Sequence, residues 1–119
     1  MTVSPSTPPH FDAEQALRLA RETFDIEAAA LTGLAARVDE RFAQAVQMVL
    51  HSTGRLVVMG MGKSGHVGRK IAATLASTGT PAFFVHPAEA SHGDLGMVTG
   101  ADLVLAISNS GESGELTAI

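Results

Sequence analysis

Two short stretches of the chain gather residue types that could hold a small ligand and act on it. Residues 108–113 read Ser-Asn-Ser-Gly-Glu-Ser, which places three hydroxyls and an amide just before a predicted helix. Hydroxyl groups and the backbone N–H groups of a helix N-terminus together form a site for an anion such as phosphate, and no arginine is needed. The alternative is a polar turn with a good N-cap, which explains one serine but not the cluster. We therefore expect a phosphate group to bind here.

The second stretch, residues 60–66, is a glycine-rich loop with the sequence Gly-Met-Gly-Lys-Ser-Gly-His. Its three glycines fit the G-x-G-x-x-G turn of dinucleotide-binding folds. That fold also needs an acidic residue at the end of the next strand, but His86 and Pro87 occupy that position here. Its Gly-Lys-Ser resembles the end of a P-loop, whose first glycine would fall on Val57. Neither nucleotide motif is complete, and Ser64 is left as a further hydroxyl for a phosphate.

The elements that must position these loops follow from the spacing of apolar residues. The run 56–59 is short, unbroken and rich in β-branched residues, which predicts a strand buried on both faces. Further strands are predicted at 82–85 and 103–107, and a helix over 64–78 ends at Gly79. This order predicts a parallel α/β sheet with right-handed crossovers, in which ligands bind beyond the carboxyl ends of the strands.

The remaining segments are predicted to be helices and loops. Apolar residues at helical spacing predict one helix over 12–32, a break or a bend at Gly33, and a second helix from Val38 to Leu50. Residues 87–97 are expected to form a loop with one helical turn at 88–91.

The composition excludes several classes of protein. The 119 residues are 45% hydrophobic and 17% charged with a net charge of −4, which is enough for one domain with a moderate core. Eight basic against twelve acidic residues, without Trp or Tyr, argue against a nucleic-acid surface. The absence of cysteine excludes disulfides and thiolate zinc sites. No apolar run reaches the roughly 20 residues of a membrane helix, and residues 1–10 do not read as a secretory signal, so we expect a cytoplasmic protein.

Three of these loops together resemble one family. The stretch 108–113 resembles the phosphate signature of the sugar isomerase (SIS) domain, and the stretches 58–66 and 84–97 closely resemble the D-arabinose 5-phosphate isomerase family. The resemblance implies the N-terminal portion of a doubly wound parallel-sheet SIS domain, preceded by two helices. Its parts would be a flexible N-terminus over 1–11, N-terminal helices over 12–54, and an α/β core over 55–119.

The resemblance also implies an activity and a set of site residues. These enzymes interconvert D-ribulose 5-phosphate and D-arabinose 5-phosphate, the precursor of the lipopolysaccharide sugar Kdo. The family's catalytic lysine and glutamate fall on Lys63 and Glu115, and a histidine at the sugar end of the substrate falls on His92. Such a carboxylate acts as a general base between C1 and C2, and such a cation stabilises the developing oxyanion. No cofactor or metal is required. The implied phosphate contacts are Ser64, Ser108, Asn109, Ser110 and Ser113.

Each of these residues also has a purely structural interpretation. Lys63 would then be a solvated loop lysine, and His92 would only hydrogen-bond the following turn. Glu112 and Glu115 both lie in the first turn of a predicted helix, where carboxylates favour the helix dipole, and Glu112 is the better candidate for that role alone. His86 and His92 could hold a divalent ion opportunistically, but no third ligand stands at a fixed spacing.

The resemblance further implies chain beyond Ile119. Family members continue through two more strands with a second glutamate and a histidine of the active site, usually followed by a pair of CBS modules. We therefore expect these 119 residues by themselves to be inactive, and the full-length enzyme to be a homo-oligomer, a tetramer by family. The alternatives are a non-catalytic SIS module that senses a sugar phosphate, or a SIS isomerase for another sugar phosphate. A DNA-binding regulator is disfavoured, because the N-terminal helices lack a basic recognition face.

Overall fold

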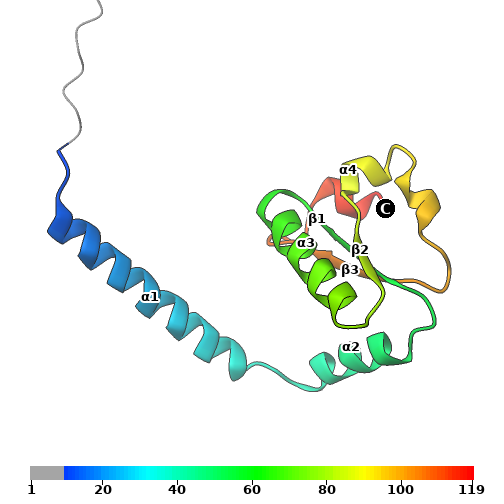
Figure 1. Ribbon diagram of the computed structural model, residues 1–119, viewed down its shortest axis with the longest axis horizontal. Helices are drawn as coiled ribbons and strands as arrows, with labels where there is room; N and C mark the ends of the chain where they lie inside the picture. The colour runs from blue at the N-terminus through cyan, green and yellow to red at the C-terminus, as the bar shows by residue number, and fades with distance from the viewer. Residues whose placement is uncertain (1–9) are drawn as a thin grey trace, which may run out of the picture. The chain divides into compact units, whose positions relative to one another are not determined.

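The computed structural model describes residues 10–119, so the flexible terminus predicted over 1–11 lies almost wholly outside the described residues. The chain forms two compact units, Met1–Phe42 and Ala43–Ile119 (Figure 1). The division falls in the first turn of helix α2, which spans Glu40–His51. None of the described helices is long and apolar enough to cross a membrane.

The first unit is dominated by helix α1, which spans Ala13–Ala35. Its N-terminus is capped by Asp12, whose carboxylate accepts a hydrogen bond of 3.0 Å from the backbone N–H of Gln15. Of the two possibilities predicted at Gly33, a break is wrong, since the helix continues for two more residues to Ala35. A glycine inside a helix costs only about 1 kcal/mol relative to alanine, which the neighbouring turns outweigh.

The second unit contains the three-stranded sheet, whose strand order is β2-β1-β3. Strand β1 (Leu56–Gly60) lies in the centre and pairs in parallel with β2 (Ala82–Phe84) and β3 (Leu103–Ile107). The parallel α/β arrangement predicted from the sequence is thereby confirmed. Because β1 precedes both neighbours in the chain, each of them is reached by a crossover connection.

Strand β1 carries the core, and all five of its residues are buried. Its side chains alternate between two apolar clusters, as expected from the period of two in a strand. Val57 and Met59 pack on one face with Ala90, and Leu56 and Val58 pack on the other with Ala72. Burial of each large apolar side chain contributes roughly 1.5–3 kcal/mol relative to its exposure. The unbroken apolar run therefore matches a strand covered on both sides.

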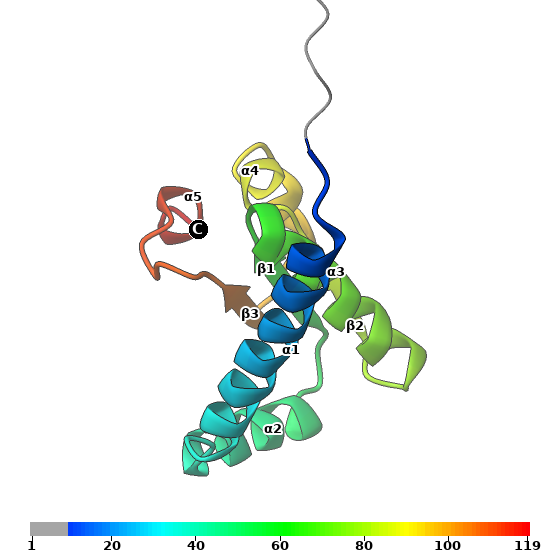
Figure 2. The same ribbon diagram turned by 90° about the vertical axis from the view of Figure 1, so that its left-hand side faces the viewer.

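The helices of this unit form the two covering layers. Helix α3 (Gly62–Ser77) covers the face with Val58, while the short helices α4 (Pro87–Ala90) and α5 (Gly114–Thr117) lie on the other face, where Leu116 joins the cluster. Figure 2 shows α3 and α5 on opposite sides of β1. The loop predicted over 87–97 thus contains α4 and a 3-10 turn over Asp94–Met97.

An ion pair closes the amino ends of β1 and β3. The Asp102 side chain is 1% exposed and accepts hydrogen bonds from the Arg55 guanidinium at 3.0 Å, from the Arg55 backbone N–H at 2.7 Å and from the Thr99 backbone N–H at 2.9 Å. The same guanidinium donates to the Met97 carbonyl oxygen and lies 4.6 Å from the centre of the Phe83 ring. The Arg55 side-chain and backbone donors hold the pKa of the Asp102 carboxyl well below its ordinary value.

Candidate functional site

The two chemically interesting loops leave the sheet at the same edge. Gly60 at the end of β1 is in register with Ile107 at the end of β3. The glycine-rich loop and the loop 108–113 therefore begin at neighbouring positions. This is the carboxyl edge of a parallel sheet, where ligands of α/β proteins bind.

The glycine-rich loop brings the N-terminus of α3 against the end of β1. A Cβ atom built on Gly65 would lie 2.6 Å from the Gly60 carbonyl oxygen, so no side chain fits there. Gly62 has a φ of 55°, a left-handed conformation that glycine adopts at little cost. These two requirements explain the glycine spacing without a dinucleotide.

Helix α3 begins at Gly62, two residues earlier than predicted. Lys63, which was predicted to lie just before the helix, and Ser64, which was predicted to open it, both lie in its first turn. Lys63 is exposed and Ser64 is partly buried. The N-cap residue is Met61, and within the described chain no side chain caps this helix end. The first N–H groups of a helix have no intrahelical partner, so this end offers donors to an anion.

The loop 108–113 is folded by its own hydroxyls. Ser108 Oγ accepts a 3.0 Å hydrogen bond from the Gly111 backbone N–H, and Ser110 Oγ accepts one of 3.2 Å from the Glu112 N–H. Gly111 adopts the left-handed φ of 71° that this turn requires. A hydroxyl that accepts in this way keeps its O–H as a donor. The turn therefore presents two hydroxyl donors from an ordered backbone, and both serines are exposed.

Ser113 differs from the other serines of this loop. Its hydroxyl donates a 3.1 Å hydrogen bond to Glu115 Oε2, so its single hydrogen is directed at the carboxylate. The family resemblance implies a phosphate contact for Ser113, whereas this hydrogen bond to Glu115 is not predictable from the sequence. No spacing rule would have revealed it, since it depends on the backbone of the short helix α5.

The predicted histidines lie on the same face of the sheet as α5. Ala90 of α4 and Leu116 of α5 share one apolar cluster, and His92 follows α4 directly in an exposed turn. His86 caps α4, because its Nδ1 accepts a 3.2 Å hydrogen bond from the Ala88 N–H. Its free proton is therefore on Nε2 when the ring is neutral. Among residues 10–119, no group of three or more His, Asp or Glu side chains is arranged to hold a metal ion.

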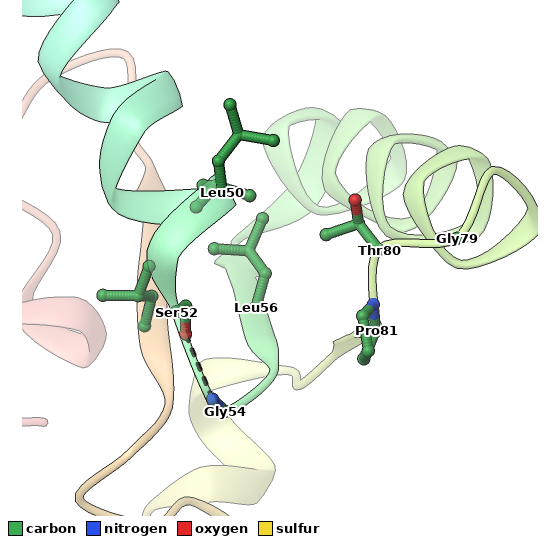
Figure 3. Close-up of a pocket in the computed structure, with 9 residues that line it drawn as sticks. Leu50, Ser52, Gly54, Leu56, Gly79, Thr80 and Pro81 are labelled. Carbon is green, nitrogen blue, oxygen red and sulfur yellow. Dashed lines mark hydrogen bonds between the residues drawn. The ribbon is translucent and has the colours of Figure 1, made fainter.

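A pocket of about 280 Å³ lies at the other end of the sheet, away from these loops. It is bounded by the first residues of β1 and β3, the end of α2, and the segment before β2. Leu50 and Leu56 lie between Ser52 on one side and Thr80 on the other, and Ser52 Oγ accepts a hydrogen bond from the Gly54 N–H (Figure 3). Its described lining contains no charged side chain, which makes it a poor site for a phosphate.

Comparison with known proteins gives a consistent family. The SIS domain family model matches residues 49–119. A relative named arabinose 5-phosphate isomerase KdsD, from Pseudomonas aeruginosa, is 59% identical over 100 residues, which are 84% of this chain and 31% of the relative. The protein of the same name from Escherichia coli K12 is 57% identical over 111 residues, covering 93% of this chain and 33% of its own length. The chain thus spans about a third of the length of these curated relatives.

Solved structures give the same fold. An E. coli CFT073 protein in complex with A5P superposes with a TM-score of 0.85 at 42% identity, covering 91% of this chain and 57% of that one. A putative phosphosugar isomerase involved in capsule formation from Bacteroides fragilis gives a TM-score of 0.81 at 39% identity, covering 87% and 55%.

Proposed function

The chain belongs to the SIS domain family, and from this premise we propose that it supplies the phosphate-binding edge and part of the catalytic site of an aldose–ketose isomerase. The proposed reaction interconverts D-ribulose 5-phosphate and D-arabinose 5-phosphate. One observation carries the proposal. The hydroxyl-rich loop after β3 and the uncapped N-terminus of α3 emerge side by side, because Gly60 and Ile107 are in register.

The phosphate is proposed to bind between these two features. The N–H groups of the first turn of α3 supply a positive field, and the side chains of the loop supply hydroxyl and amide donors. Charge-assisted hydrogen bonds of this kind are about twice as strong as neutral ones. The proposed phosphate contacts are Ser64, Ser108, Asn109, Ser110 and Ser113. Ser113 is the weakest of them, since its hydrogen already bonds Glu115.

The proposed chemistry is proton transfer between C1 and C2. In the aldose-to-ketose direction, a carboxylate takes the proton from C2 and electrons move onto the C1 carbonyl oxygen, which gives an enediolate. The proton then returns to C1, while the O2 hydroxyl passes its own proton to O1, so that O1 becomes a hydroxyl and C2–O2 becomes the carbonyl. We assign the base to Glu115, the cation that stabilises the oxyanion to Lys63, and a contact with the sugar hydroxyls to His92.

We further propose a role for the product and a setting for the enzyme. The high identity to relatives named arabinose 5-phosphate isomerase supports a place before Kdo and lipopolysaccharide synthesis. We propose a cytoplasmic homo-oligomer that uses no cofactor.

A second candidate is isomerisation of another sugar phosphate. It is favoured by the B. fragilis neighbour, whose name gives a phosphosugar without specifying the pentose. The phosphate-binding edge would be the same in both enzymes, so the difference would lie in the contacts to the sugar. A non-catalytic sugar-phosphate sensor would bind the same ligands without turnover.

The test measures isomerisation by the complete gene product in D2O. We expect D-arabinose 5-phosphate to be converted to the ketose with deuterium entering at C1 or C2, and glucose 6-phosphate to react poorly. Ser110→Ala should weaken binding of the sugar phosphate by about 1–3 kcal/mol, since it removes a donor to a charged group. Ser77→Ala is the matched control, because that hydroxyl only bonds the Thr74 carbonyl oxygen within α3.

Three outcomes would separate the alternatives. Faster turnover of a hexose phosphate favours the second candidate. Binding of the pentose phosphate without deuterium exchange favours a sensor. Equal binding by the parent protein and the Ser110→Ala variant would contradict the phosphate site.

A further inference from the structure

The connection between β2 and β3 contains an exposed stretch with few anchors. Residues 85–102 leave the sheet at the end of β2, form α4 and the 3-10 turn, and return to the start of β3, as the yellow to orange part of Figure 1 shows. Ala90 and Val98 pack on the apolar cluster of β1. Between them, no residue of the stretch 91–97 is buried. This stretch carries His92.

The hydrogen bonds of the stretch 91–97 are local with one exception. The backbone N–H groups of His92 and Gly96 each donate to a carbonyl oxygen three residues earlier, at 3.0 Å. Within the described chain, only the carbonyl oxygen of Met97 is bonded to a residue more than four positions away, and the donor is the guanidinium of Arg55. One side chain therefore ties this stretch to the start of β1.

The Arg55 side chain is itself held from two sides. Its guanidinium donates to the Asp102 carboxylate through Nε at 3.3 Å and through a terminal nitrogen at 3.0 Å, and it lies over the ring of Phe83 in β2. Two parallel hydrogen bonds to a carboxylate fix the plane of a guanidinium as well as its position. Such a fixed donor matches the last carbonyl oxygens of a helical turn, which have no partner within that turn. The bond to Met97 thus caps the 3-10 turn that follows His92.

We propose that Arg55 is a positioning residue, which holds the stretch 91–97, and with it His92, in place from the amino end of the sheet. The inference rests on the proposed contact between His92 and the sugar. A role confined to the pairing of β1 with β3 would need only the bonds to Asp102, and it would leave the bond to Met97 unexplained. A direct contact of Arg55 with an anion is disfavoured, because the carboxylate beside it offsets its charge.

Hydrogen–deuterium exchange of the complete gene product tests this tie without any substrate. Arg55→Met removes every donor of the side chain. Because stretches with few buried contacts open locally, we expect the N–H groups of residues 92–98 to exchange about tenfold faster, while α3 keeps its protection. Arg41→Met is the matched control, since Arg41 also pairs with an aspartate, at 2.7 Å from Asp39, but makes no bond to this stretch.

Steady-state kinetics tests whether the tie acts through His92. Arg55→Met should lower kcat/KM for D-arabinose 5-phosphate about tenfold, because displacement of a group by 1 Å is enough for such a loss. The inhibition constant of inorganic phosphate should stay within about twofold of the parent value, since the tie makes no bond to the loop 108–113. General damage to the fold would instead weaken phosphate binding as well.

A double-mutant cycle separates action through His92 from an independent effect. If Arg55 acts by placing His92, Arg55→Met should cost little in a protein that already carries His92→Ala. The combined variant should then have nearly the same kcat/KM as His92→Ala alone.

Arg55→Lys provides a second variant that does not depend on the stability of Arg55→Met. A lysine keeps a charge beside Asp102, but its single ammonium group lacks the planar fork that reaches Asp102 and Met97 together. We expect near-normal unfolding in urea, faster exchange of residues 92–98, and a kcat/KM between those of the parent and Arg55→Met.

Two results would overturn the proposal. The first is unchanged exchange of residues 92–98 in both Arg55 variants. The second is a combined variant in which the losses from Arg55→Met and His92→Ala simply multiply. A parent protein without isomerase activity would instead contradict the proposed function, and the exchange measurement would still decide whether Arg55 holds the stretch.

Discussion

The polar side chains at the two ends of the parallel sheet differ in how much of their hydrogen-bonding capacity is used within the fold. At the amino end, the carboxylate of Asp102 is buried and receives hydrogen bonds from Arg55 and from the Thr99 backbone. At the carboxyl end, Ser108 and Ser110 accept bonds that fold their own turn, and their O–H groups remain as donors. The adjoining N-terminus of α3 carries no side-chain cap among the described residues.

This difference indicates that the amino end of the sheet stabilises the fold, whereas the carboxyl end has donors left for a ligand. A buried carboxylate surrounded by donors rigidifies the chain but has little left to offer a ligand. An ordered turn with unused donors loses little entropy when an anion arrives, because its backbone is already fixed.

The largest effect is expected from the proposed catalytic groups at the carboxyl end. Glu115→Gln and Lys63→Ala should each lower kcat by about 10²–10⁴ with little change in KM, because they act on the transition state. Glu112→Gln is the matched control, because Glu112 is an exposed carboxylate in the loop that leads into α5, three residues before Glu115. Steady-state kinetics of the complete gene product provide the measurement. A change confined to KM would reduce both residues to binding groups.

Adding a side chain in the tight turn between β1 and α3 should lower the stability of the fold as well as weaken binding. Gly65→Ala places a Cβ 2.6 Å from the Gly60 carbonyl oxygen and should destabilise the fold by about 1–3 kcal/mol. Gly33→Ala, where no described atom lies within 4 Å of the new Cβ, should instead stabilise α1 by about 0.5–1 kcal/mol. Urea unfolding of both variants checks the pair. Equal effects of the two substitutions would show that the approach of α3 to β1 is looser than the structure indicates.

Ser113 should act mainly as a positioning residue for Glu115 and contribute little as a phosphate contact. Ser113→Ala is expected to lower kcat by about tenfold with KM nearly unchanged, since loss of one hydrogen bond to a charged group costs about 1.5 kcal/mol. Ser113→Thr keeps the hydroxyl and should restore most of the rate. In contrast, Ser110→Ala should raise KM. The opposite pattern, with Ser113→Ala acting on KM, would return Ser113 to the phosphate site.

The smallest effect is a pH dependence at the amino end. The folded state holds the pKa of Asp102 below its ordinary value, so the ion pair stabilises the fold above about pH 4 and this contribution fades as the pH falls further. Asp102→Asn should therefore lower the melting temperature at pH 7, and the difference from the parent should shrink between about pH 4 and pH 2. Thermal melts across that range measure it. A difference that is independent of pH would mean that shape, and not charge, holds Asp102 in place.

Much of the fold was predictable because it rests on local patterns. The unbroken run of β1 predicted a strand covered on both faces, and the spacing of apolar residues predicted α1 and α3 to within two or three residues at each end. The glycines of the turn after β1 were recognised as unusual, and their reason is steric. The composition of the loop 108–113 predicts an anion site, because three hydroxyls and an amide stand just before a helix.

By itself, the sequence determined the main helices and strands and the parallel class of the sheet, since each depends on the spacing of neighbouring residues. Only the tertiary structure decided which groups meet. Arg55 and Asp102 are 47 residues apart and carry no motif. The bond from Ser113 to Glu115 depends on how one short helix begins, and the register of Gly60 with Ile107 depends on how two strands align. Periodicity constrains each element along its own axis, whereas contacts between elements depend on the packing of all of them together.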